Sequence, residues 1–97
     1  MSVVIIGGND CMVCRYKTLC KEYRCKPKIF TQMSGSMKEQ IGNPDLLILF
    51  TGTVSHKMVQ CALAGVDSKN TVIARSHSSS MTSLKNILDT HVLRTNT

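Results

Sequence analysis

Acidic residues and aromatic side chains are what this sequence has least of. Six Asp and Glu stand against twelve Lys and Arg, so the formal net charge is +6 at pH 7. A positively charged surface favours anionic partners. The aromatic residues are two Tyr, two Phe and no Trp, too few for a platform on which nucleic-acid bases stack. We therefore expect a small anionic ligand and do not expect nucleic acid.

Long apolar runs are also missing. The longest, Leu46–Phe50, is far shorter than the ~20 residues that cross a membrane. The first run, Val3–Ile6, ends at two glycines and does not resemble a signal peptide. We expect a cytoplasmic protein whose five cysteines are reduced thiols or metal ligands rather than disulfides. The 97 residues allow one domain, for which a homodimer would bury additional surface.

Short apolar runs alternate with segments of helical periodicity. Strands are expected at residues 3–6, 28–31, 46–50 and 71–74. Helices are expected from residue 12 to the vicinity of Pro27, briefly at 36–41 behind a Ser36/Glu39 capping box, at 54–65, and at 81–92 behind Ser80. Strands joined by helices form a parallel sheet with right-handed crossovers. The pattern predicts a Rossmann-like or flavodoxin-like three-layer α/β sandwich with four parallel strands, and analogy with flavodoxin-like folds gives the expected order 2-1-3-4.

Polar residues follow three of these strands directly. The carboxyl ends of parallel strands meet at one edge of the sheet, where open α/β folds bind ligands. Helix N-termini at that edge also favour anions. The candidate ligand-binding residues are Gly8, Asn9, Thr51, Thr53, Ser55, His56, Lys57, Arg75, Ser76, His77, Ser78, Ser79 and Ser80.

Ordinary structural roles compete with this interpretation. Gly7-Gly8 lacks the third glycine of a dinucleotide fingerprint, and a tight strand-to-helix turn explains the pair equally well. Ser and Thr before a helix are usual caps. Capping does not require His56, His77 and Arg75, however, and a neutral imidazole can coordinate a metal, including haem iron. His56 is therefore also a candidate metal ligand.

Four cysteines cluster within fifteen residues, in a spacing that matches no common zinc or iron–sulfur motif. On a helix, Cys20 falls on the apolar face and is expected in the core, whereas Cys11 and Cys14 fall on the polar face. Cys11 and Cys14 are either incidental exposed thiols or a ligand or redox pair, which Cys25 or a second subunit would complete. An Fe–S cluster or Zn is the alternative cofactor.

Several short motifs carry a family resemblance. Val54-Ser55-His56-Lys57 after one strand and Arg75–Ser80 after the next, with Val3–Gly8 at the start, resemble a bacterial family known as domain of unknown function 2325. A motif with Cys14, Tyr16, Lys17 and Cys20 is similar to a short clostridial-type subgroup. The resemblance implies a small Rossmann-like domain that is dimeric, and it makes haem a candidate ligand of His56 and residues 75–80.

No acidic residue is placed to orient either rim histidine, so a catalytic set is incomplete and an enzyme is not favoured. The expected function is a small ligand-binding or sensory domain for an anionic cofactor, either haem or a phosphate-containing ligand. The alternative is a Cys-ligated metal or thiol redox module.

Overall fold

Four parallel strands form one sheet in the computed structural model, which describes residues 2–32, 40–66 and 69–91. The order across the sheet is β2-β1-β3-β4, as the sequence predicts. The strands are β1 (Ser2–Ile6), β2 (Lys26–Phe30), β3 (Leu46–Phe50) and β4 (Val72–Ser76). Ser2 of β1 lies opposite Lys26 of β2, and Leu46 of β3 lies opposite Val72 of β4.

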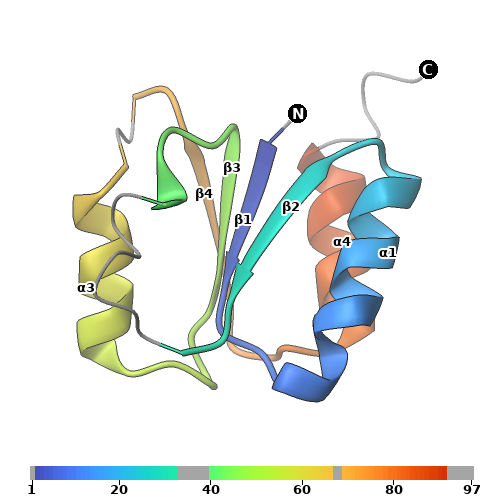
Figure 1. Cartoon of the computed structure of the whole chain (residues 1–97), viewed down its shortest axis with the longest axis horizontal. Coiled ribbons are helices and arrows are strands. Elements are labelled where there is room, and N and C mark those ends of the chain that lie inside the picture. The colour runs from blue at the N-terminus through green and yellow to red at the C-terminus, as the bar shows by residue number, and fades with distance from the viewer. Residues whose placement is uncertain (1, 33–39, 67–68, 92–97) are drawn as a thin grey trace.

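Helices cover both faces of the sheet. After a 3-10 turn, η1 (Asp10–Met12), the helix α1 (Val13–Glu22) packs with α4 (Met81–His91) on one face, and α3 (His56–Ala64) lies on the other. Figure 1 shows the sheet edge-on between these two layers of helices. This arrangement confirms the three-layer α/β sandwich.

The two central strands explain why their sequences are continuously apolar. All five residues of β3 are fully buried, because α3 covers one face of the strand and α1 and α4 cover the other. Val3 and Ile5 of β1 contribute to the core beneath α1 and α4, and Val4 and Ile6 contribute to the core beneath α3. A strand buried on both faces has no position at which a polar side chain is favourable.

The first helix ends earlier than Pro27 alone indicates. The N–H of Cys25 donates to the carbonyl of Cys20 (2.9 Å), and that of Arg24 donates to Lys21 (2.9 Å), with Arg24 at φ 60°. These bonds form a Schellman motif, which ends α1 at Glu22. The chain then enters β2 at Lys26, two residues before the expected start.

Two other boundaries differ from expectation. β4 extends through Arg75 and Ser76, because both pair with β3, so these residues belong to the strand and not to the following loop. The first helical turn begins at Asp10 as the 3-10 turn η1, two residues before the expected start at residue 12. The expected Ser36/Glu39 capping box and Val92 lie outside the described residues.

Candidate rim site

The loops that follow β1, β3 and β4 are bonded to one another at the carboxyl edge of the sheet, which is the lower edge in Figure 1. The N–H of Gly8 donates to Oγ1 of Thr53 (2.8 Å), which joins the first loop to the second. The N–H of Gly52 donates to the carbonyl of His77 (3.2 Å), which joins the second loop to the third. The structure therefore brings the three polar stretches together at one rim, as expected.

Close packing of the loops explains their glycines. Gly8 has φ 88°, and a Cβ there would lie 2.7 Å from the ring of Tyr16. A Cβ on Gly52 would lie 2.3 Å from the carbonyl oxygen of His77. These contacts lie within the protein, so they favour the turn interpretation of the first glycine pair over a cradle for a ligand.

Most of the rim hydroxyls bond to other groups of the protein. Oγ of Ser55 accepts the N–H of Met58 (3.2 Å) and caps α3. Oγ of Ser80 accepts the N–H of Ser83 (3.2 Å), and Oγ of Ser78 donates to Oγ of Ser80 (3.2 Å). These side chains act as the caps and loop supports that the alternative interpretation assigns to them.

A groove between α3 and β4 contains three of the candidate residues. It has a volume of about 420 Å³, within the range of small-molecule sites. Thr51, His56 and Arg75 provide a hydroxyl, an imidazole and a guanidinium. The other lining residues are Val54, Val59, Gln60 and Leu63. The groove thus joins a polar end, which holds a fixed positive charge, to an apolar wall.

One hydrogen bond in the groove constrains His56. Nε2 of Gln60, one helical turn later, lies 3.0 Å from Nε2 of His56. If the amide donates, the ring proton of His56 is on Nδ1. Sequence reasoning missed Val59, Gln60 and Leu63 as residues of the groove. Their signal was the helical spacing of three, four and seven residues from His56.

The remaining candidates lie at the rim but do not line this groove. Lys57 and His77 are exposed, and the carbonyl of His77 bonds to Gly52. The other candidate residues outside the groove lining are Gly8, Asn9, Thr53, Ser55, Ser76, Ser78, Ser79 and Ser80.

The structure does not bring the candidate cysteines together. Cys11 in η1 and Cys14 at the start of α1 are exposed, whereas Cys25 is buried beyond the far end of α1, before β2. Cys20 is fully buried, as expected, and burial raises the pKa of its thiol to about 12, with a smaller contribution from Cys25. Cys61 of α3 is half-buried and packs against the core cluster between α3 and the sheet. Within the described ranges, no three His, Cys, Asp or Glu side chains are placed to hold a metal ion.

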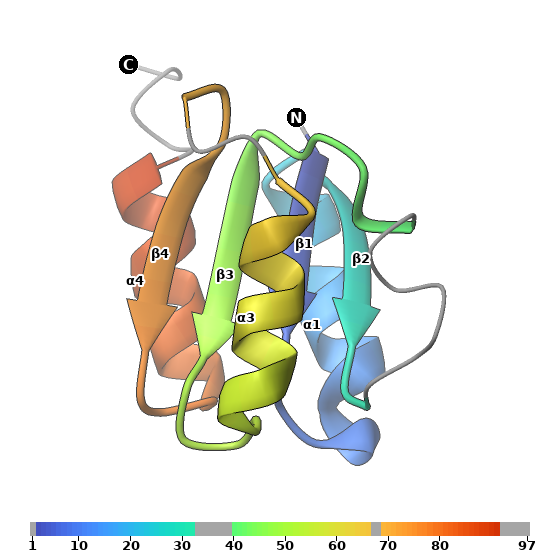
Figure 2. The same ribbon diagram turned by 90° about the vertical axis from the view of Figure 1, so that its left-hand side faces the viewer.

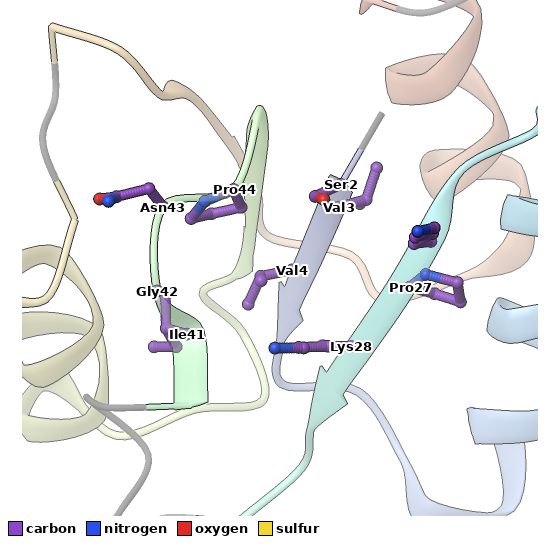
Figure 3. A pocket seen from close by; sticks show the side chains of 10 residues that line it. Ser2, Val3, Val4, Pro27, Lys28, Ile41, Gly42, Asn43 and Pro44 are labelled. Atoms are coloured by element: carbon purple, nitrogen blue, oxygen red, sulfur yellow. The ribbon is translucent and has the colours of Figure 1, made fainter.

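A second cavity, of about 340 Å³, lies against β1 and β2 (Figure 3). Val4 and Ile41 give it apolar walls, and Lys28 extends across it to donate from Nζ to the carbonyl of Gln40 (3.0 Å). It contains none of the candidate residues. Its lysines come from an edge strand, a position where lysine is common without any ligand.

The fold and the rim define a Rossmann-like α/β domain with a ligand-sized groove at the carboxyl edge of its sheet. A family model described as "Uncharacterized protein conserved in bacteria (DUF2325)" matches residues 2–91, so the chain belongs to this family. No curated protein and no solved structure matches the chain. Among the helices that the structure describes, none is long and apolar enough to span a membrane.

Proposed function

We propose that this domain binds a small anionic ligand in the groove between α3 and β4, and that it acts as a ligand-binding or sensory domain. The supporting observation is that Arg75 and His56, from different elements, line one groove with Thr51. The guanidinium would pair with a carboxylate or phosphate, for which its planar donors are well suited. The net charge of +6 also favours such a ligand.

Haem is the first ligand to test, because its chemistry corresponds to both parts of the groove. Val54, Val59 and Leu63 would contact the porphyrin, and Arg75 would pair with a propionate. The imidazole of His56 would coordinate the haem iron once Gln60 releases its Nε2. Haem, when bound, would supply a coloured, redox-active iron. A phosphate-containing ligand would use Arg75 and Thr51 without coordination by His56.

Haemin titration monitored by absorbance tests this proposal. We expect a shifted Soret band with wild type, loss of that band with His56→Ala, and weaker binding with Arg75→Gln. His77→Ala is the matched control, because His77 is the other rim histidine but lies outside the groove lining. An unchanged spectrum in His56→Ala would show that His56 does not coordinate the iron.

The result also separates the two ligand classes. If haemin does not bind, native mass spectrometry of the purified protein tests for a retained phosphate-containing ligand, and Arg75→Gln should lose it. Absence of both would contradict the proposal.

A cytoplasmic location belongs to the same proposal, because free thiols suit a reducing compartment.

The second candidate function is a metal or redox module based on Cys11 and Cys14. Both thiols are exposed and lie three residues apart, Cys11 in η1 and Cys14 at the start of α1. Because Cys25 is distant from them in the fold, another chain or molecule would have to supply further Fe–S or Zn ligands. Elemental analysis of anaerobically purified protein tests this function, with Cys14→Ser as the variant and Cys61→Ser as the control. Metal-free wild type would exclude the metal site and leave only a thiol redox role for Cys11 and Cys14.

A further inference from the structure

The two edges of the sheet differ in how well they can pair with another strand. β2 and β4 are the edge strands, visible at opposite sides of the sheet in Figure 2. In a parallel sheet, the N–H and C=O of one residue point to the same side, and successive residues alternate. The bonds to the inner strand therefore identify the residues whose backbone groups face outward.

On β2 the outward edge is protected. The carbonyl of Phe30 accepts from the N–H of Gly7 (2.8 Å), so the backbone N–H and C=O of Phe30 point toward β1. The backbone groups of Pro27 and Ile29, at alternate positions, point away from β1. Pro27 has no N–H to donate, and Lys26 and Lys28 flank it. Proline and lysine are the residues with which natural sheets prevent edge-to-edge pairing.

On β4, which has Arg75 but neither proline nor lysine, no such protection of the outward edge is found among the described residues. Val72 donates to the carbonyl of Asp45 (3.0 Å), and Ser76 accepts from Thr51 (2.8 Å), so both backbones face β3. The N–H and C=O groups of Ile73 and Arg75 therefore face outward. Val72 is 48% exposed, the highest value for a large hydrophobic side chain among the described residues.

We infer that the edge of β4 pairs with the same strand of a second copy of this chain, antiparallel about a twofold axis at Ala74. This register places Ile73 opposite the partner's Arg75 and Arg75 opposite the partner's Ile73. Each of these pairs exchanges both of its backbone hydrogen bonds, so every outward N–H and C=O of the strand acquires a partner. Val72 then lies opposite the partner's Ser76, which covers part of its exposed surface.

A second copy suits this edge because the strand is complementary to itself in that register. Ala74, the residue on the axis, has a small side chain that is directed toward the core with Leu84 and Leu88. The same pairing on β2 would place Pro27 in the interface. The dimer would be one continuous eight-stranded sheet, with the groove of each copy on the same face beside the axis.

The position of Arg75 connects this dimer to the ligand site, a consequence that rests on the proposed function. The two Arg75 side chains would lie on one face, as diagonal neighbours about 7–8 Å apart. Each groove would then have a second guanidinium nearby, so one anionic ligand could be held by both copies.

Sedimentation equilibrium without added ligand tests the dimer independently of ligand binding. Ile73→Pro removes an outward N–H that makes no bond within the sheet, and Ile29→Pro does the same on the other edge. We expect wild type and Ile29→Pro to be dimers. Two lost donors per dimer, each about tenfold in affinity, should weaken the Ile73→Pro dimer about 100-fold.

Amide hydrogen exchange in wild type gives a second test that needs no substitution. The amides of Ile73 and Arg75 should be protected, while that of Ile29 exchanges rapidly. A monomeric wild type, equal dissociation of the two proline variants, or rapid exchange at Ile73 and Arg75 would each overturn the inference.

Discussion

Tyr16→Phe should weaken the connection between the core and the rim. Tyr16 is fully buried, its ring centroid lies 5.7 Å from that of Phe50, and its hydroxyl donates to the carbonyl of Ser79 (2.6 Å). The substitution keeps the ring and removes only the donor. Ser79 is half-buried, so water replaces the lost bond only in part. We expect a loss of about 1–2 kcal/mol in the free energy of unfolding. In a domain of this size, each kcal/mol lowers Tm by about 4–8 °C.

Circular dichroism during thermal and urea unfolding measures this loss. Tyr23→Phe is the matched control, because its hydroxyl bonds to Asp89 of α4 from the opposite end of α1. Amide exchange should accelerate at Ser79 and Ser80 in Tyr16→Phe but not in Tyr23→Phe. A Tyr16→Phe stability within about 0.5 kcal/mol of wild type, with unchanged exchange at Ser79, would refute the role of this bond.

Three further predictions concern thiols and the end of α1. Cys11 and Cys14 should react with a disulfide reagent at once, and Cys20 and Cys25 only after unfolding; rapid reaction of Cys20 would contradict its burial. Because the pKa of Cys20 is raised from 9.0 to about 12, its contribution to stability is present below pH 9 and is lost as pH rises toward 12. Cys20→Ala should therefore flatten the alkaline loss of stability in urea titrations, and an unchanged slope would disprove this origin. Arg24→Gly should raise the free energy of unfolding by about 0.5–1 kcal/mol, because glycine adopts the positive φ without strain; a decrease would contradict the Schellman ending.

The sheet was predictable because burial leaves a simple pattern. Runs such as Leu46–Phe50 indicate strands covered on both faces, and the helical segments between them require parallel pairing. The order 2-1-3-4 came from analogy with flavodoxin-like folds, and the structure confirms it. Boundaries were less predictable. The residues around Arg24 do not indicate that it adopts a positive φ, and this conformation is what ends α1 before Pro27.

The position of the rim could be predicted from the sequence, but the role of each rim residue could not. Parallel strands alone bring the three loops together, but whether a hydroxyl remains available for a ligand depends on neighbours distant in the sequence. Thr53, a candidate ligand-binding residue, accepts the N–H of Gly8, forty-five residues earlier, a contact that the sequence does not indicate. Cys25 was one of two candidates to complete the Cys11/Cys14 pair, and the structure places it in the core beyond the other end of α1.

A two-dimensional 15N–1H NMR titration tests the groove most directly, with haemin and inorganic pyrophosphate as separate ligands. With at least one of them, we predict saturable shifts or broadening at the amides of Thr51, His56, Gln60 and Arg75. No change at these amides with either ligand, or changes confined to Lys26, Lys28 and Gly42 around the second cavity, would contradict the account.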